Sequence, residues 1–299
     1  MTDYKLLTHQ TAQGPRAGIL VGGNVFDVER YARVVDILED WDAAQPLLEA
    51  AAAKAQSGGT PLMQAKLLAP VLYPSAIYCA GANYGDHVAE MNKAQGRGPD
   101  PDPHELGLKP WHFLKATRVV VGPGAAVPIP AGAKKVDWEV ELTSVIGRTA
   151  KGVSIERALE CVAGYTLADD VSARDLGQRP PLTKESPFFW DWVAHKSFDA
   201  SCPLGPWITP AKQIPDPQAL GIKLWVNDAI KQDSHTSKMI FTLAEQIAQI
   251  SSRTTLYPGD LILTGTPAGV GAGRNEFLKA GDVVKLWCEG IGELSHTMA

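Results

Sequence analysis

The sequence predicts an α+β protein in which strands dominate and helices are few. Short apolar runs recur along the chain and are separated by turns rich in glycine and proline, of which the 299 residues contain 28 and 22. Segments with helical potential are fewer, and they do not alternate regularly with the strands. This pattern disfavours a Rossmann fold or a TIM barrel, and it favours a β-rich body with helices at its periphery.

The first 70 residues are predicted to form a small N-terminal lobe without a recognisable catalytic motif. Short strands are expected between Lys5 and Val28, followed by a helix over residues 34–55 that Pro46 interrupts. The main body would then span residues 71–299. Turn-forming residues mark the strand ends and the join to this body: Gly14-Pro15, Gly22-Gly23-Asn24, Ala69-Pro70 and Tyr73-Pro74.

In the main body, the expected strands are short apolar runs that end at glycine or proline turns. They are Val119–Val121, Val140–Ile146, Ile222–Val226, Leu261–Thr264 and Val283–Trp287. Three other segments are expected to be helical, and the last of them has apolar residues at helical spacing. These segments are Tyr84–Ala94, Ile155–Leu159 and Ile240–Ser251.

Composition excludes several classes of protein. The chain is 45% hydrophobic and 20% charged, which suits a packed core and argues against disorder. Its net charge of −5 supplies no basic field, so we expect a small-molecule partner and neither nucleic acid nor a membrane. The four cysteines lack a CxxC pair, so neither a zinc site nor a disulfide framework is indicated. No signal peptide or membrane-spanning run is evident, and we expect a cytoplasmic protein.

Three carboxylates form the strongest chemical signal in the sequence. Glu139 and Glu141 are two residues apart at the start of an apolar run, so on a strand both side chains would project from the same face. Asp170 follows a second apolar run and adds a third carboxylate. An all-oxygen set suits Mg²⁺, Mn²⁺ or Ca²⁺ better than zinc. The alternative is a solvated strand whose charged residues bind nothing, since such residues are mostly exposed.

A histidine and a glutamate indicate acid–base chemistry. His87 and Glu90 are three residues apart in a segment with helical potential, where side chains at this spacing are neighbours. A glutamate that accepts a hydrogen bond from one imidazole nitrogen raises the basicity of the other, which suits a general base. The alternative is a surface pair that contributes little.

Cations and hydroxyls near these motifs are candidates for binding an acidic substrate. Lys196 lies in an aromatic and apolar stretch that would partly bury its ammonium group, and a buried lysine needs an anion. Arg174 is a further candidate, although an ion pair with Asp175 or Asp170 would explain it equally well. Thr264-Gly265-Thr266 follows an apolar strand, so its hydroxyls and amides can hold a carboxylate. The same tripeptide is also a common turn.

Together these motifs resemble the fumarylacetoacetate hydrolase superfamily, in its branch of acylpyruvate hydrolases and 2-hydroxyhepta-2,4-diene-1,7-dioate isomerases. The matching blocks run in order over roughly residues 73–294. They are Asn83–Met91, Phe113–Lys115, Asp137–Leu142, Ala163–Asp175, Lys196–Asp199, Pro203–Pro206 and Pro258–Gly271. The resemblance implies a mixed β-roll core, a divalent-metal cofactor and a homodimer.

The resemblance also implies roles for individual residues. The metal, with Mg²⁺ as the first expectation, would be held by Glu139, Glu141 and Asp170. Catalysis would involve His87, Glu90 and Lys196. Substrate contacts would come from Tyr84, Lys115, Arg174, Gly265 and Thr266.

The chain departs from the common family pattern at two positions. Gly177 stands where many relatives have glutamine after Arg-Asp-Leu, and His195 stands where a small residue usually precedes the lysine. Between these positions lie four aromatic residues, which are Phe188, Phe189, Trp190 and Trp192. We expect them to form a lid or wall over the cleft that favours a bulky or apolar acyl group, the alternative being a dimer contact or core packing.

These assignments predict a metal-dependent hydrolase that cleaves a carbon–carbon bond of a 2,4-dioxo acid, such as an acylpyruvate or fumarylpyruvate, in the breakdown of aromatic compounds or sugar acids. His87 with Glu90 would activate water, and Lys196 would offset the charge of the oxyanion. The same core would also serve an oxaloacetate decarboxylase or a 2-hydroxydienoate isomerase. A non-catalytic binding member of the fold is the alternative from another class, and three converging acids argue against it.

Overall fold

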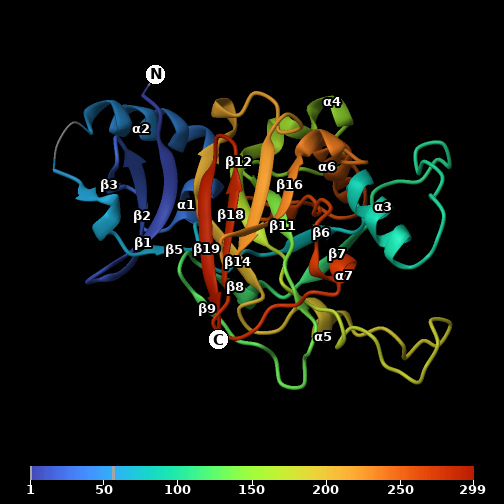
Figure 1. The fold of residues 1–299 in the computed structure, drawn as a ribbon. Coiled ribbons are helices and arrows are strands. Elements are labelled where there is room, and N and C mark those ends of the chain that lie inside the picture. The colour runs from blue at the N-terminus through green and yellow to red at the C-terminus, as the bar shows by residue number, and fades with distance from the viewer. Residues whose placement is uncertain (1, 56–57) are drawn as a thin grey trace.

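A computed structural model describes residues 2–55 and 58–299. Figure 1 shows strands at the centre of the molecule with helices around them, so the predicted α+β class with a β-rich core is confirmed. The helices are α1 (Val34–Glu39), α2 (Trp41–Lys54), α3 (Gly85–Ala94), α4 (Ile155–Ala158), α5 (Trp192–Lys196), α6 (Leu243–Arg253) and α7 (Gly271–Arg274). Short 3₁₀ turns occur at Leu62–Gln64, Thr117–Val119, Leu159–Cys161, Ala211–Gln213 and Thr236–Lys238.

The largest sheet contains 12 strands within the described residues. They are β1 (Lys5–Thr11), β2 (Gly14–Val21), β3 (Asn24–Asp27), β4 (Thr60–Pro61), β5 (Leu67–Leu68), β6 (Ile77–Ala80), β7 (His112–Lys115), β8 (Val120–Val121), β11 (Val140–Ile146), β12 (Val162–Asp169), β14 (Cys202–Pro210) and β17 (Leu261–Leu263). The main order is β4-β3-β2-β1-β14-β12-β11-β17-β6-β7. Strand β5 pairs with β1, and β8 pairs with β14.

Two smaller sheets complete the fold. The strands of a five-stranded sheet are β9 (Ala126–Val127), β15 (Gly221–Val226), β16 (Ala229–His235), β18 (Val283–Cys288) and β19 (Gly292–Met298). Their order is β16-β15-β18-β19-β9 within the described part of the chain. A short pair joins β10 (Val136–Asp137) to β13 (Ser172–Ala173), beside the positions where the predicted acids lie.

The N-terminal strands continue the large sheet. Strand β1 pairs with β2 on one side and with β14 on the other, where Leu6 lies opposite Ile208. The hairpin from β2 to β3 turns at Gly22 and Gly23, whose φ angles of 54° and 84° suit a tight hairpin. The first 70 residues therefore share a sheet with the main body, and a domain join near residue 70 stays a prediction.

The helix expected over residues 34–55 forms as two helices, α1 and α2. The break lies at Asp40, whose φ of −108° and ψ of 31° are not helical, and the expected break at Pro46 was wrong. Pro46 lies inside α2 near its N-terminal end. There the missing N–H removes a single helical hydrogen bond without ending the helix.

Two apolar cores lie on opposite faces of the large sheet. The first core packs β11 and β12 against β15, β18, β19 and α6, and the second packs α1, α2 and the N-terminal strands onto the other face. Alternation along β17 shows the arrangement, because Ile262 belongs to the first core while Leu261 and Leu263 belong to the second. Burial on both faces explains why these strands are continuous apolar runs in the sequence.

Most elements predicted for the main body are present. Strand β11 has the predicted bounds, and α3 and α4 lie within one residue of theirs. Helix α6 begins later than predicted because Thr242 caps it. The Thr242 hydroxyl accepts from the Glu245 amide at 3.3 Å, and the Glu245 carboxylate accepts from the Thr242 amide at 2.7 Å.

Candidate active site

A cavity of about 140 Å³ lies at the centre of the main body, and the predicted acids form part of its wall. Its walls come from the ends of β6, β11, β12 and β17 and from α3, β7 and α5. Three acids, two histidines and two cations line it, together with aromatic rings. Segments that are distant in the sequence therefore meet at one small polar site.

The three predicted metal ligands are close together in this wall. Glu139 precedes β11, Glu141 lies within it, and Asp170 follows β12. Because Val140 pairs with Asp169 across the two strands, one carboxylate oxygen from each acid lies within 4.8 Å of the other two. Their exposed fractions are 5%, 1% and 1%, so the group is shielded from water.

The charge and chemistry of this triad fit a divalent cation. Burial in the first place, and then the charges of Asp170 and Glu139, raise the pKa of Glu141 well above its ordinary value. This raised pKa means that the protein's own cations do not fully offset the negative charge. The amide of Gly265 donates to Glu141 Oε2 at 2.7 Å and fixes the carboxylate. Buried carboxylate oxygens that lack compensating charge are suitable ligands for a hard divalent metal.

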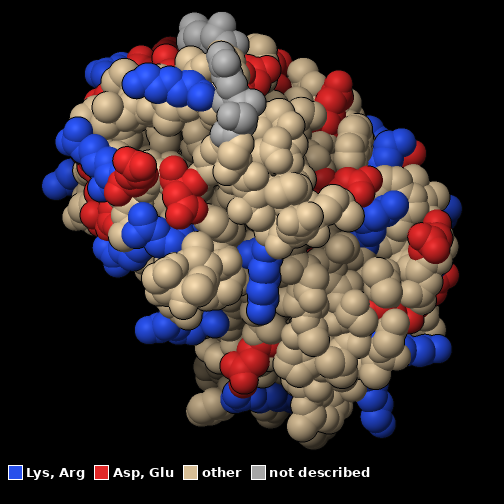
Figure 2. Space-filling model, turned by 90° about the vertical axis from the view of Figure 1, so that its left-hand side faces the viewer, with Lys and Arg blue, Asp and Glu red and all other residues tan. Residues whose placement is uncertain are grey.

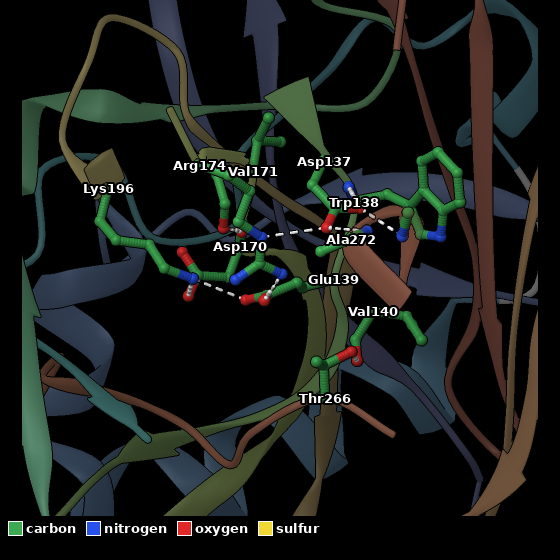
Figure 3. Close-up of polar contacts among 12 residues, drawn as sticks. Asp137, Trp138, Glu139, Val140, Asp170, Val171, Arg174, Lys196, Thr266 and Ala272 are labelled. Carbon is green, nitrogen blue, oxygen red and sulfur yellow. Dashed lines mark hydrogen bonds and ion pairs between the residues drawn. The ribbon is translucent and has the colours of Figure 1, made fainter. Parts of the chain in front are cut away.

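Lysines neutralise part of the triad. The Lys196 ammonium donates to Glu139 Oε2 and to Asp170 Oδ2, each at 2.6 Å (Figure 3). The Lys115 ammonium donates to Asp170 Oδ1 at 2.6 Å. Burial by itself would raise the pKa of Glu139, but the charges of Arg174 and Lys196 outweigh it and hold this pKa well below the ordinary value. Glu139 and Glu141 thus differ in charge compensation.

Arg174 does not make either of the ion pairs considered from the sequence, within the described part of the chain. Its guanidinium donates to Asp137 at 3.0 Å and also to Glu139 (Figure 3). Asp175 instead accepts a backbone N–H at 2.8 Å. Arg174 lies on the cavity wall, so it both fixes Glu139 and faces the space where a ligand would bind.

Asp137 is a site residue that the sequence reasoning did not assign. Its side chain is fully buried, and besides Arg174 it accepts the amides of Gly271 and Ala272 at 2.6 and 2.9 Å. These bonds connect the start of α7 to the triad. The available signal was its place at the start of the motif Asp137–Leu142.

The expected hydrogen bond between His87 and Glu90 is absent among the described residues. Glu90 lies on the same helix but accepts the backbone amide of Gly269 at 2.8 Å, a charge-assisted bond that turns it away. His87 lines the cavity, and its Nδ1 is buried without a partner in the described structure. Burial is the main cause that lowers the pKa of His87 to about 4, so the ring is neutral at pH 7.

The predicted substrate contacts occupy different places. Thr266 lines the cavity, and its hydroxyl donates to the Val140 carbonyl at 3.0 Å. Tyr84, Lys115 and Gly265 are not among the described residues that line it. Tyr84 is fully buried in the first core, and the other two contact the acids from behind the wall. Short-range sequence proximity to the motif therefore does not imply contact with the cavity.

An aromatic wall is present, but its members differ from those predicted. Trp192 lines the cavity and stacks on Phe113, with ring centroids 5.3 Å apart and planes at 22°. Trp111 meets the edge of Trp192 at 6.1 Å, and Trp190 stacks on the outside of Trp192 at 5.9 Å. Phe188 is 67% exposed. Of the predicted aromatic segment, only Trp192 is among the described residues that line the cavity.

A larger cavity of about 670 Å³ adjoins the first one. The two cavities share Gly81, Ala82 and Trp111, and the larger one extends along α3 and residues 99–109. Trp111 packs so closely on Gly81 that a Cβ atom there would lie 1.9 Å from its ring. Trp111 thus lies between a small cavity that contains the acids and a roomier one.

The face seen in Figure 2 carries no single-sign field, because acidic and basic side chains are interspersed there among uncharged ones. Among the helices of residues 2–55 and 58–299, none is both long and apolar enough to cross a bilayer. Several relatives described below are named as mitochondrial proteins, so the expected cytoplasmic location stays a prediction.

Residues 76–299 match the model of the family described as fumarylacetoacetate (FAA) hydrolase, C-terminal. A protein of Xenopus laevis named as a mitochondrial oxaloacetate tautomerase is 39% identical over 307 aligned positions, which cover 98% of this chain and 90% of the relative. A human protein with the same description is 38% identical, with 93% and 86% covered. The resemblance drawn from the sequence motifs is confirmed.

Solved structures show the same similarity. The 2-hydroxyhepta-2,4-diene-1,7-dioate isomerase of Mycobacterium marinum matches with a TM-score of 0.72 and 32% identity, covering 99% of this chain and 98% of that one. The maleylpyruvate hydrolase of Sphingobium sp. SYK-6 matches with a TM-score of 0.76 and 28% identity, covering 98% and 99%. The similarity therefore extends over the N-terminal residues as well as the acid-lined cavity.

Proposed function

Because this chain belongs to the fumarylacetoacetate hydrolase family, we propose that it is a metal-dependent enzyme that interconverts the keto and enol forms of oxaloacetate or a similarly compact 2-oxo dicarboxylic acid. Relatives that align over nearly the whole chain are named oxaloacetate tautomerases. This reaction replaces carbon–carbon hydrolysis as our leading assignment. It uses the metal-enolate chemistry of the decarboxylase and isomerase alternatives.

The observation that carries this proposal is the small cavity in which three buried acids face a neutral histidine. Its volume of about 140 Å³ is below the roughly 300–1,000 Å³ of pockets for drug-sized ligands, so it suits a compact substrate. In the described part of the chain, no carboxylate hydrogen-bonds to His87 to assist it in activating water, since Glu90 is bound to Gly269. Enolisation requires a base and no attacking water.

We assign the metal to Glu139, Glu141 and Asp170, with Mg²⁺ or Mn²⁺ as the ion. When bound, it would supply a Lewis acid that holds the substrate's carboxylate and 2-oxo oxygens and offsets negative charge on the latter. Lys196 adds a fixed positive charge beside two of these acids. Although burial opposes it, Asp170 and Glu139 raise the pKa of Lys196, so this side chain stays protonated.

His87 is the residue that would move the proton. Its Nδ1 is buried, which leaves Nε2 to remove a proton from C3 of the keto acid. The C2–C3 bond becomes double, and the C2 oxygen takes up a proton. Nε2 can deliver this proton because C2 is the neighbour of C3, so the same nitrogen lies near both positions. No atom is gained or lost, and the reverse steps regenerate the keto acid. The pKa of about 4 ensures that the ring is free to accept a proton at neutral pH.

Carbon–carbon hydrolysis of a 2,4-dioxo acid is the second candidate, and the adjoining cavity of about 670 Å³ favours it. An acyl group could extend past Trp111 into this space. The likeness to a maleylpyruvate hydrolase is consistent with such a substrate. A non-catalytic binding role is disfavoured, because a purely structural role gives no reason for three buried acids to converge at one cavity.

A direct assay separates these functions. Enol-oxaloacetate is added to the purified protein with Mg²⁺, Mn²⁺ or a chelator, and malate dehydrogenase with NADH reports the keto acid. We expect metal-dependent acceleration that Glu141→Gln abolishes and that Glu293→Gln, an exposed control on β19, retains. Parallel assays measure pyruvate released from oxaloacetate and from acylpyruvates. Faster pyruvate release from either substrate, or no acceleration with any metal, would refute the tautomerase assignment.

We also propose that the protein is a homodimer. Large apolar side chains are exposed around α5 and β7, where Val193, Phe188 and Leu114 have exposed fractions of 70%, 67% and 60%. Strand β7 and helix α5 are neighbours, because Phe113 stacks on Trp192, and exposed apolar side chains that gather on neighbouring elements are typical of a protein contact. Light scattering of the purified protein should give twice the chain mass of 32.0 kDa, and a monomer at all concentrations would contradict the proposal.

A further inference from the structure

His195 is a polar side chain on the cavity wall that the proposed reaction leaves without a role. It lies on α5 directly before Lys196, and its exposed fraction is 9%. Both ring nitrogens are buried, and neither has a hydrogen-bond partner among the described residues. A buried imidazole without partners is costly, because each nitrogen has lost its water. The imidazole is therefore a hydrogen-bonding group of the cavity wall that no described residue satisfies.

Gly177 makes the space for this ring. A Cβ atom on Gly177 would lie 2.8 Å from Cγ of His195 and 2.9 Å from its Nδ1, closer than real Cβ atoms approach. The carbonyl of Gly177 accepts the amide of Asp191 at 3.1 Å, which fixes this backbone against the start of α5. Gly177 and the imidazole of His195 are thus coupled by steric fit, because a side chain at position 177 would collide with this ring.

The ring of His195 packs between Trp192 and Gly177. It stacks on Trp192, with centroids 5.6 Å apart and planes at 25°, and its Cγ–Nδ1 edge faces Gly177. Nε2 lies on the opposite edge of the ring, away from the Gly177 backbone, and is buried like Nδ1. Burial, followed by the charges of Lys196 and Arg174, lowers the pKa of His195, so the ring is neutral and carries one N–H donor and one acceptor.

Three other polar side chains of the wall already have protein partners, and His87 serves as the base of the proposed reaction. Lys196 is bound by Glu139 and Asp170, and Arg174 is bound by Asp137 and Glu139. The Thr266 hydroxyl donates to a backbone carbonyl. Both ring nitrogens of His195, in contrast, have no partner among the described residues, so this side chain is available to a substrate group that lies away from the metal.

We propose that His195 determines specificity by donating a hydrogen bond from Nε2 to the distal carboxylate of the substrate, so that the site selects 2-oxo dicarboxylic acids over their monocarboxylic analogues. The proposal rests on the proposed function, because it takes the triad and its metal to hold the 2-oxo acid end. Gly177 acts as a positioning residue that allows the ring to lie in the wall.

Binding of malate and lactate tests this without turnover. The two 2-hydroxy acids differ in the distal carboxylate, and calorimetry in the presence of Mg²⁺ measures each. His195→Phe keeps the stacking on Trp192 but removes both nitrogens. We expect it to weaken malate binding by about tenfold to a hundredfold, the range for a hydrogen bond to a charged group, and to leave lactate binding within about twofold. His195→Gln keeps a hydrogen-bond donor, so its affinity for malate should lie between those of the parent and His195→Phe.

Gly177→Ala supplies an independent variant. It should displace the ring and weaken malate binding in the parent protein, and it should have little effect when His195 is already alanine. Binding of Mg²⁺ alone and the melting temperature verify that each variant keeps its site. An equal loss for malate and lactate, or no loss for either, would overturn the proposal. This test measures binding and needs no turnover. A protein that does not tautomerise oxaloacetate can therefore still confirm or refute the role of His195.

Discussion

Glu141 and Glu139 differ in charge compensation. A glutamate-to-glutamine substitution at each position should therefore change the stability of the metal-free protein in opposite directions. Burial and two neighbouring acids raise the pKa of Glu141, so its ionised form destabilises the metal-free fold above its ordinary pKa. Glu141→Gln removes that charge, and the new amide oxygen can still accept from Gly265. The metal-free variant should therefore be more stable than the parent at pH 7.

The magnitude follows from the geometry. Two unit charges 4.8 Å apart repel by about 3 kcal/mol at an effective dielectric constant of about 20. Glu141 has two such neighbours, and Lys196 offsets roughly one of them, so about 3 kcal/mol remains. At about 2 °C per kcal/mol for a chain of this size, the melting temperature of the metal-free protein should rise by roughly 6 °C.

Glu141→Gln should stabilise the metal-free protein but remove the additional stabilisation that a bound metal provides. A ligand at 100 times its dissociation constant stabilises the fold by about 2.7 kcal/mol, or roughly 5 °C, and Glu141→Gln should lose this shift. Glu139→Gln is the matched control. Its pKa is held low by Arg174 and Lys196, so its ionised form stabilises the fold above pH ~4.3, and the substitution should destabilise the metal-free protein by about 3–5 kcal/mol.

Differential scanning fluorimetry measures the melting temperatures of the parent, Glu141→Gln and Glu139→Gln, each with a chelator and with excess Mg²⁺. If Glu141→Gln lowers the melting temperature of the metal-free protein, the charge of Glu141 is compensated and the reasoning fails. If Mg²⁺ still stabilises this variant as much as the parent, the triad is not the metal site.

Three further predictions follow from the structure. His87→Ala should lower the tautomerisation rate by about 10²- to 10⁴-fold while Mg²⁺ and malate bind as in the parent; a loss of only a few-fold would place the base elsewhere. Burial lowers the pKa of His112 to about 4, so its contribution to stability is complete above pH ~6.5 and is lost as the pH falls toward 4. Denaturant unfolding should therefore lose about 2 kcal/mol less between pH 7 and 5 in His112→Phe than in the parent, and identical losses would contradict this. Trp190→Ala removes the ring that supports Trp192, so if acylpyruvates are cleaved, kcat/KM should fall more for bulky acyl groups than for acetylpyruvate; an equal fall would refute a specificity role.

Local patterns predicted much of the fold and of the acid triad. Alternation in a strand has a period of two, so the spacing of Glu139 and Glu141 is enough to place both on one face. The apolar runs around them predicted buried strands for the same reason. Asp170 is near them because β11 and β12 pair, which the order of the family motifs indicated but which the spacing alone did not.

Partners of individual side chains could not be predicted in this way. Helical spacing makes Glu90 a neighbour of His87, yet its carboxylate accepts an amide 179 residues further along the chain. Tyr84 lies next to the motif in sequence, but the start of α3 turns it into the first core. In each case a contact from another segment outweighs the local geometry.

The sequence by itself determined the β-rich class, the set of acids and the family, because these depend on short-range periodicity and on residue types in order. The tertiary structure alone decided which cations offset which acids, that Asp137 holds Arg174, and that Gly177 leaves room for the ring of His195. The physical reason is that charge compensation and steric fit act over a few ångströms between segments that are far apart in the chain. Only the packing of the two sheets and α5 brings those atoms together.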